Sequence, residues 1–396
     1  MIIAWVKNNL FNTWYNVVLT LLSVSFLYWF ASGFLFWAFT EARWGVIGDN
    51  LPLFFAGRYP VDSQWRLWLI AAIIAFLGGL SWGCLGGGRL LNPPLLVSFS
   101  FLGLLCLVLT PVTGVNITAG LLGLLGLLLL TGLSGRRLRG FGPWLGLLWS
   151  ASFLPVYWLL LGGVGLKVIP IDDLSGLVLT LVTAVISIVL CFPFGVLLAL
   201  GRQTDLPVIR WLCIAYIEVV RGLPLIGILF MAQVMLPLIL PIDVRPDRVI
   251  RAIAGFTIFA SAYLAENVRG GLQSVSIGQK EAGKALGLNP VLITILIVLP
   301  QALKAVIPSL VGQFISLFKD TSLLAIVGLV DLLGMAQSIL ANPRYIGRYQ
   351  EVYLFVALIY GIFCYFMSLT SRQLERSLNN EGQTNKISLT KSSNVT

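Results

Sequence analysis

Runs of about twenty apolar residues recur along this chain, and a helix needs about that many to cross a bilayer. Of the 396 residues, 58% are hydrophobic and only 11% are charged. Backbone polar groups inside lipid must pair within their own segment, so helices are expected at this apolarity. The sequence therefore predicts an all-α polytopic membrane protein with about ten transmembrane helices. The predicted spans are Trp14–Phe39, Leu67–Leu85, Leu95–Pro111, Ile117–Leu133, Trp144–Leu161, Leu177–Leu200, Leu212–Leu240, Val249–Ala265, Val291–Leu317 and Val352–Leu369.

The residue types argue against covalent chemistry. The chain has no His, the commonest metal ligand and general base. Its five cysteines lie in apolar runs without C-x-x-C spacing and are interpreted as small buried hydrophobic residues. They are Cys84, Cys106, Cys191, Cys213 and Cys364. We expect no catalytic residues, no metal site and no enzyme activity.

The distribution of Lys and Arg predicts the orientation, because cytoplasmic loops carry an excess of positive charge. With a cytoplasmic N-terminus, the inner loops hold Arg89, Arg136, Arg137, Arg139, Arg202, Arg210, Lys280, Lys284, Arg372 and Arg376. The outer loops hold Arg43, Arg58, Arg66 and Lys167, with Glu41, Asp49 and Asp62 as counter-charges, and also Arg245, Arg248 and Arg251. An even number of spans places both termini in the cytoplasm. The net charge of +10 is then a property of these loops and not a sign of nucleic-acid binding.

The chain divides into three parts by composition. Residues 1–174 are predicted to be about five extra transmembrane helices that act as packing scaffold. Within them Gly120, Gly123 and Gly126 are expected to bring helix backbones close together. Residues 175–374 carry charged and polar groups in or beside apolar spans, and the polar segment 375–396 is predicted to be a disordered cytoplasmic tail.

A short polar segment at 276–288 predicts a helix between two spans. Ser276 and Gln279 have the spacing of a capping box, Gly287 suits a left-handed position after the helix, and Pro290 stops its continuation. The small residues Ala282 and Gly283 would allow a partner surface to approach closely.

The same segment resembles the cytoplasmic EAA signature of ABC-importer permeases, which reads E-A-A, three residues, Gly, nine residues and I-x-L-P. The residues in register are Glu281, Ala282, Gly287, Ile297, Leu299 and Pro300. Gly283 departs from it, since Ala is usual there. The resemblance implies that Glu281, Ala282, Gly283 and Gly287 lie on a coupling helix that receives motion from an ATPase partner.

A second pattern in this segment is dismissed. Residues 278–285 fit G-x-x-x-x-G-K, but Ala285 stands where a phosphate-binding loop needs Ser or Thr, and no strand precedes it. This chain is thus expected to hold no cofactor, with ATP and Mg bound by partner ATPase subunits.

Charged groups inside spans are costly and need partners or water. Glu218 and Arg221 lie three residues apart on one predicted helix, where they are expected to neutralise each other. Glu266, Asn267 and Arg269 end the next span and are interpreted as anchors at the interface.

The span after Pro300 carries Gln313, Ser316 and Asp320 at helical spacing. A polar face of this kind is costly against lipid, so we expect it to face the centre of a permease pair. Asp320 would accept an ammonium group there, and Gln313 or Ser316 would bind a carboxylate. The alternative, that this face serves only a subunit interface, stays open.

Three further stretches extend the resemblance over residues 177–374: Ile217-Glu-Val-Val-Arg-Gly-Leu-Pro-Leu225, Ala262-Tyr-Leu-Ala-Glu-Asn-Val-Arg-Gly270 and Leu317-Phe-Lys-Asp-Thr-Ser-Leu323. They are similar to the polar amino-acid uptake permeases of the His/Glu/Gln type, whose shortest members have five spans and form a type I ABC-importer core. Residues 50–60 and 65–68 resemble the longer permease of the general L-amino-acid systems of the Aap/Bzt type.

These resemblances imply a bacterial inner-membrane permease subunit of a binding-protein-dependent ABC importer that carries L-amino acids. They also imply its partners: ABC ATPase subunits, a homologous second permease and a periplasmic amino-acid-binding protein. An ion-coupled secondary transporter of small polar solutes is the first alternative, but it would need ionisable groups at mid-membrane in both halves. A membrane enzyme is the second, and without His no convincing nucleophile–base set is present.

Overall fold

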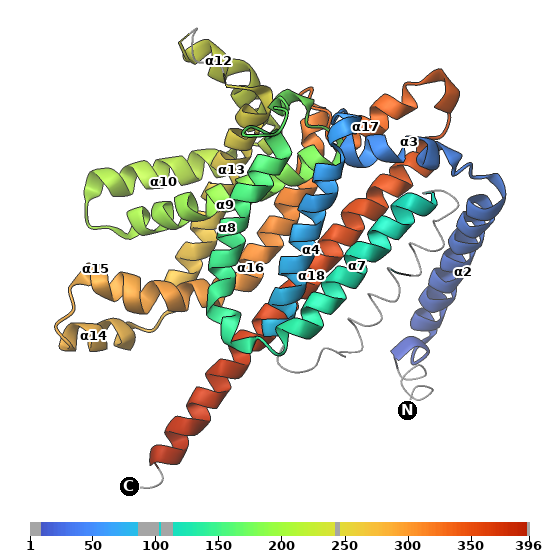
Figure 1. Ribbon diagram of the computed structural model, residues 1–396. Helices are drawn as coiled ribbons and strands as arrows, with labels where there is room; N and C mark the ends of the chain where they lie inside the picture. The colour runs from blue at the N-terminus through green and yellow to red at the C-terminus, as the bar shows by residue number, and fades with distance from the viewer. Residues whose placement is uncertain (1–8, 86–102, 104–113, 242–245, 394–396) are drawn as a thin grey trace.

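The computed structural model describes residues 9–85, 103, 114–241 and 246–393, and within them the chain is a bundle of helices (Figure 1). Eight helical segments of this part are long and apolar enough to cross a membrane, and a bent pair of helices is a ninth candidate. The eight are Trp14–Glu41, Val61–Cys84, Val115–Gly135, Gly140–Leu161, Gly176–Gln203, Arg248–Ser274, Pro290–Ala325 and Tyr349–Arg372. Each coincides with a predicted span, which confirms the all-α polytopic membrane fold. The predicted span Leu95–Pro111 lies outside the described residues, apart from residue 103.

The prediction of one continuous span at Leu212–Leu240 is wrong. Helix α10 (Pro207–Gly222) ends at Gly222, and the chain turns by 107° before it continues. Leu223 is extended because a residue before proline is disfavoured in the helical region, and Pro224 cannot donate a helical hydrogen bond. The continuation consists of α11 (Leu225–Phe230), a π-helical turn at Met231–Met235 and α12 (Leu236–Ile239).

The centre of the bundle is the contact between α9 (Gly176–Gln203) and α13 (Arg248–Ser274), which α16 (Leu299–Asp320) joins from the other side. A Cβ atom at Gly195 would lie 2.6 Å from Leu264 Cδ2 and 2.9 Å from the Ser261 carbonyl oxygen. A Cβ at Gly271 would lie 2.6 Å from the Ala302 carbonyl oxygen. The three helices therefore approach to backbone contact, as small residues permit in membranes.

The N-terminal helices α4 (Trp65–Leu85) and α7 (Val115–Gly135) pack through glycines other than those expected. Gly79 and Gly83 meet backbone atoms of α7, whereas a Cβ at Gly123 or Gly126 would meet nothing within 4 Å. Of the predicted set, Gly120 alone is close-packed, against the Trp68 ring. A spacing of three residues turns by about 60° short of a full helical turn, so such a series cannot stay on one contact face. Helix α8 (Leu145–Leu161) completes this group beside α4.

Helix α3 (Gly45–Ala56) joins the N-terminal segment to the rest of the bundle. It packs on α9, on α17 (Leu332–Leu340) and on α18 (Tyr349–Ser393). Phe54 is fully buried there, with its ring centroid 5.0 Å from that of Phe355. A boundary at 174/175 thus separates two parts of the sequence that share a hydrophobic core, because α3 packs with α9, α17 and α18. Helix α2 (Trp14–Phe36) lies at the edge of the bundle and has no buried residue.

Figure 1 places the start of α2, helix α14 (Ile277–Ala285) and the end of α18 at one end of the bundle, with α3, α12 and α17 at the other. This is the arrangement expected when both termini lie on one side of the membrane. Helix α18 continues over 375–393, where disorder was predicted. A span that is already helical extends without a new nucleation step, so a polar continuation can remain helical.

Candidate functional site

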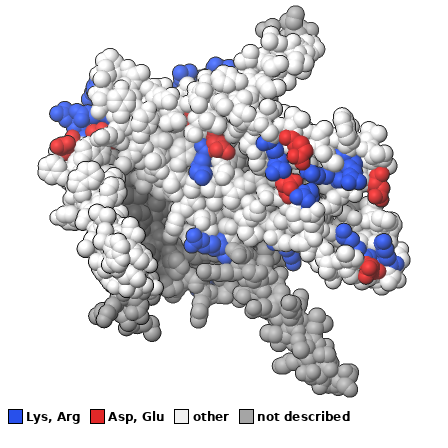
Figure 2. Space-filling view, turned by 180° about the vertical axis from the view of Figure 1, so that it is seen from behind, with Lys and Arg blue, Asp and Glu red and all other residues white. Residues whose placement is uncertain are grey.

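The charged side chains that Figure 2 shows gather mainly near the ends of α9, α10, α13 and α14, and uncharged surface separates them from the rest. Two features of the structure contain the residues that the sequence analysis identified as candidate site residues. One is α14 itself, and the other is a groove between α13 and α16.

Helix α14 has the predicted ends. Its N-cap is Ser276, and Gly287 has a φ of +75°, which confirms the left-handed position. The amide of Gly287 donates to the Lys284 carbonyl at 2.9 Å, and the amide of Leu288 donates to the Gly283 carbonyl at 3.2 Å. These two bonds form a Schellman motif, which satisfies the last carbonyls of the helix. Pro290 then starts the next helical segment, with Asn289 as its N-cap.

Two details of α14 differ from the prediction. Ser276 makes no side-chain cap hydrogen bond, and the Gln279 side chain accepts from Gln301 Nε2 at 3.4 Å, so the capping box is not formed. Gly283 is buried against this chain's own next helix, because a Cβ there would lie 2.9 Å from Ile293 Cγ1. It therefore does not offer a surface to a partner.

The exposed side of α14 is made of other residues. Glu281 and Ala282 are exposed, and Leu286 is 78% exposed at the end of the helix. These side chains are the part of α14 that remains accessible on the described chain.

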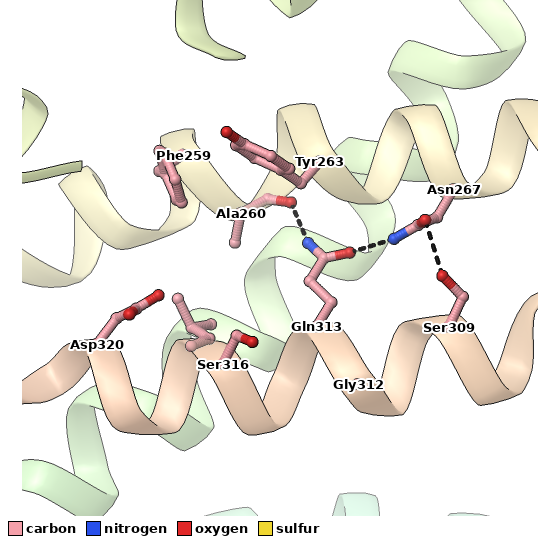
Figure 3. Close-up of a pocket in the computed structure, with 10 residues that line it drawn as sticks. Phe259, Ala260, Tyr263, Asn267, Ser309, Gly312, Gln313, Ser316 and Asp320 are labelled. Atoms are coloured by element: carbon pink, nitrogen blue, oxygen red, sulfur yellow. Dashed lines mark hydrogen bonds between the residues drawn. The ribbon is translucent and has the colours of Figure 1, made fainter. Parts of the chain in front are cut away.

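The groove between α13 and α16 has a volume of about 410 Å³ (Figure 3). It brings together all three residues of the predicted polar face, Gln313, Ser316 and Asp320, with Asn267 and Tyr263 from α13. Polar groups thus line a hollow that runs along two membrane-spanning helices.

The three predicted residues differ in how far their polar groups are engaged. Gln313 donates to the Ala260 carbonyl at 2.8 Å and accepts from Asn267 Nδ2 at 2.7 Å, so both ends of its amide are bound to α13. Ser309 in turn donates to Asn267 Oδ1 at 2.9 Å. Ser316 is exposed and Asp320 is partly exposed on the groove side of α16. Gln313 is therefore a connection between helices, and Ser316 and Asp320 are the polar groups open to the groove.

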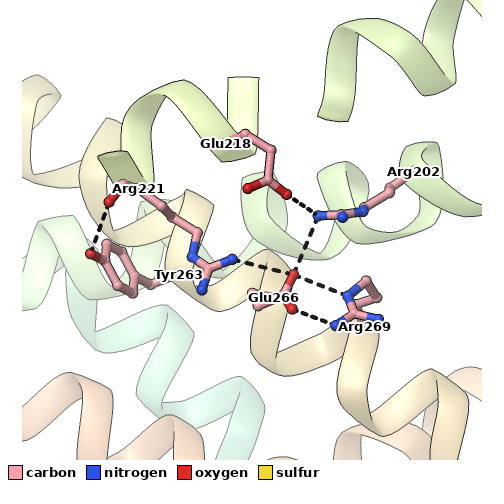
Figure 4. Close-up of polar contacts among 6 residues, drawn as sticks. All are labelled: Arg202, Glu218, Arg221, Tyr263, Glu266 and Arg269. Carbon is pink, nitrogen blue, oxygen red and sulfur yellow. Dashed lines mark hydrogen bonds and ion pairs between the residues drawn. The ribbon is translucent and has the colours of Figure 1, made fainter. Parts of the chain in front are cut away.

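The expected pairing of Glu218 with Arg221 is wrong. Glu218 pairs with Arg202 of α9 at 3.1 Å, and Arg221 pairs with Glu266 of α13 at 3.6 Å (Figure 4). Glu266 also binds Arg202 at 3.3 Å and Arg269 through both carboxylate oxygens. One carboxylate thus binds three guanidinium groups, which joins the ends of α9, α10 and α13. Of the three residues interpreted as interface anchors, Glu266 and Arg269 belong to this ion-pair cluster, whereas Asn267 lines the groove and binds Gln313 and Ser309.

Sequence reasoning missed Asp331, which lies at the opposite end of the bundle. Asp331 is 0% exposed, and as N-cap of α17 it accepts from the amides of Gly334 at 2.9 Å and Leu333 at 3.3 Å. Burial raises the pKa of its carboxyl group to about 6, against the lowering effect of these hydrogen bonds. An Asp directly before Leu-Leu-Gly was the available N-cap signal.

Comparison with known proteins decides the family. Residues 191–380 match the family described as "Binding-protein-dependent transport system inner membrane component". The inner membrane amino-acid ABC transporter permease protein YhdY of Escherichia coli is 35% identical over 393 residues, which cover 95% of this chain and 93% of that protein. This chain belongs to the permease family of binding-protein-dependent ABC transporters. The predicted family is thereby confirmed, and it is a family of transporters and not of enzymes.

Other similar proteins differ in how much of this chain they cover. The glutamate/glutamine/aspartate/asparagine transport system permease protein BztC of Rhodobacter capsulatus is 35% identical and again covers 95% of this chain and 93% of its own length. The glutamate/aspartate import permease protein GltK of Escherichia coli O157:H7 is 35% identical over 51% of this chain but 92% of its own length. A crystal structure of an amino acid ABC transporter with histidines covers 51% of this chain and 91% of its own, at 29% identity and a TM-score of 0.46. GltK is therefore about half as long as this ABC permease.

Proposed function

We propose that this chain is the longer permease subunit of an importer for polar L-amino acids, located in a bacterial inner membrane. The support is that YhdY and BztC, which are similar over 95% of the chain, are an amino-acid permease and a permease for glutamate, glutamine, aspartate and asparagine. The solute would be delivered by a periplasmic binding protein. The chain itself performs no covalent chemistry in this proposal, and ATP and Mg bind to partner ATPase subunits.

The proposed mechanism rests on helix α14, which is exposed and has a defined end on each side, the N-cap Ser276 and the left-handed Gly287. Glu281, Ala282 and Leu286 are exposed on it, while Gly283 packs on Ile293 of the following helix. A partner that pushes on the exposed side would transmit the force directly to the segment that leads into α16. We therefore assign Glu281, Ala282 and Leu286 to the ATPase contact, Gly283 to the connection inside the chain and Gly287 to the end of the helix. In this arrangement α14 and both termini face the cytoplasm.

The groove between α13 and α16 is the proposed wall of the pathway. Ser316 and Asp320 are open to it, and a polar groove on spanning helices needs a cover that excludes lipid. A homologous second permease supplies that cover in the proposal. An amino-acid zwitterion would then meet Asp320 with its ammonium group and Ser316 with its carboxylate, while Gln313 keeps the two helices in register.

The test is uptake by proteoliposomes that contain this chain, its second permease and its ATPase subunits, with the binding protein outside. Uptake of labelled glutamate, glutamine, aspartate and asparagine is measured with ATP or a non-hydrolysable analogue inside. We expect uptake that needs both ATP and the binding protein and is unaffected by collapse of the ion gradients. Uptake that continues without ATP and stops when ion gradients collapse would contradict the proposal.

A further inference from the structure

A second hollow of about 510 Å³ lies where the ends of α9, α10, α13 and α14 meet. Each helix contributes one cation to its lining: Arg202, Arg210, Arg269 and Lys280 in that order. No Asp or Glu is among its ten lining residues. The hollow is thus built from two pairs of consecutive helices, and all of its charged lining residues are basic.

The cations in this hollow are only partly neutralised. Arg202 and Arg269 bind Glu266, which lies behind the lining. Arg210 and Lys280 are exposed and have no ion pair with any part of the chain that the structure describes. Two cations without an ion pair therefore lie beside two guanidinium groups that share the Glu266 carboxylate. Such a site attracts an anion with several acceptor oxygens, and Arg binds phosphate oxygens particularly well.

The surface next to the hollow is apolar. Ile277, which lines the hollow at the start of α14, is 72% exposed, and Trp211, about 60° around α10 from the lining residue Ile214, is 67% exposed. A basic pocket beside an exposed aliphatic side chain and an interfacial Trp matches an amphipathic anion with a phosphate headgroup and acyl chains.

We propose that this hollow binds the headgroup of an anionic phospholipid from the leaflet that borders α14. The phosphodiester lies between Arg210 and Lys280, with Arg202 and Arg269 at its back, and the acyl chains follow Trp211 and Ile277. The lipid then connects α10 to α14 across a gap that the protein itself does not bridge there. This site does not depend on which solute the chain carries.

The experiment measures lipid binding to the full chain in detergent by native mass spectrometry. The added probes are dioctanoyl phosphatidylglycerol, dioctanoyl phosphatidylcholine as the zwitterionic match, and inorganic phosphate. The test variant is R210Q together with K280Q. The matched control is R58Q, which removes an exposed cation at the other end of the bundle. Thermal unfolding of each variant verifies that it is folded.

We expect phosphatidylglycerol to bind with one-to-one stoichiometry and phosphatidylcholine to bind much more weakly. Each cation removed near a lipid headgroup weakens attraction about fivefold, so the double variant should bind about 25-fold more weakly, while R58Q binds as the parent does. Equal binding of both lipids, or unchanged phosphatidylglycerol binding in the double variant, would overturn the proposal. Displacement of the lipid by equimolar inorganic phosphate would also overturn it in favour of a free-anion site. Loss of the ATPase subunits with lipid binding intact would instead identify the hollow as a protein contact.

Discussion

Asn267 of α13 donates a hydrogen bond of 2.7 Å to Gln313 of α16, and this bond gives the polar groove its arrangement. The other end of the Gln313 amide donates to the Ala260 carbonyl. Because both ends are used within the chain, Gln313 has a structural role, and Ser316 and Asp320 remain open toward the groove. The three positions of one predicted face should therefore respond differently to substitution.

The first prediction concerns labelling in the groove. S316C should react with a water-soluble thiol reagent in the assembled transporter, and substrate and ATP should change its rate at least several-fold. Q313C should react slowly and should lower the melting temperature, because Asn267 and the Ala260 carbonyl lose a partner and a lost buried hydrogen bond costs about 1–3 kcal/mol.

The control for this experiment is L310C, since Leu310 of α16 is buried, does not line the groove and should not react. Labelling of S316C that ignores both substrate and ATP would favour a subunit interface over a pathway.

The second prediction concerns the carboxylate of Glu266. E266Q should destabilise the folded chain by about 2 kcal/mol, between the values for exposed and fully buried ion pairs, because it leaves three guanidinium groups without a shared counter-charge. E218Q is the matched variant: the Glu218 side chain is 55% exposed and binds Arg202 alone, so its effect should be under about 1 kcal/mol. Melting temperatures in the same detergent compare them, and equal effects would show that the three-fold contact is not the cause.

The third prediction concerns coupling through α14. E281K should abolish ATP-driven uptake without a change in melting temperature, because Glu281 is exposed and its side chain makes no hydrogen bond or ion pair within the described residues. G287D should impair uptake and also weaken α14, since a left-handed φ of +75° costs a side chain about 1–2 kcal/mol. Co-purification of the ATPase subunits is the measurement. Retention of these subunits with full uptake in E281K would refute the docking role.

The fourth prediction concerns the N-terminal segment. Removal of residues 1–41 should leave a folded chain, because α2 has no buried residue. Removal of residues 1–167 should lower expression sharply, since it also deletes α3 and uncovers Phe355 and α17. Substrate preference should stay unchanged in any deletion that still folds, and a clean change of specificity would contradict the scaffold role.

Local features of this chain were predictable from its sequence, and contacts between distant segments were not. The spans follow from apolar runs, and Ser276, Gly287 and Pro290 mark helix ends through their own backbone preferences. The pairing of Glu266 with Arg202 could not be predicted in this way, because the two residues are 64 apart in sequence and no spacing rule connects them.

Two further predictions failed because they also depended on more than local sequence patterns. The bend at Leu223 was hidden because the apolar run continues through it, although Pro224 was the available signal. The inward direction of Gly283 depends on where Ile293 lies, which the sequence of α14 alone does not determine.

The last prediction uses the buried carboxyl group of Asp331. Its pKa is raised to about 6 in the folded chain, so between about pH 4 and pH 6 the folded state binds a proton that the unfolded state releases. The unfolding free energy should therefore fall as pH rises through this window and then become constant. The total change is about 3 kcal/mol for a shift of this size.

Asp331→Asn separates this effect from other carboxylates. Asn keeps an acceptor for the amides of Leu333 and Gly334 but cannot ionise. Melting temperatures of parent and variant are compared from pH 4 to pH 7 in one detergent. Relative to the variant, the parent should lose stability as pH rises to 6, because its carboxylate is then charged in a buried position, and the hydrogen bond from Tyr360 at 3.4 Å offsets this cost only in part. A difference between the two proteins that does not change with pH would show that Asp331 is already ionised at pH 4, and that its contacts outweigh its burial.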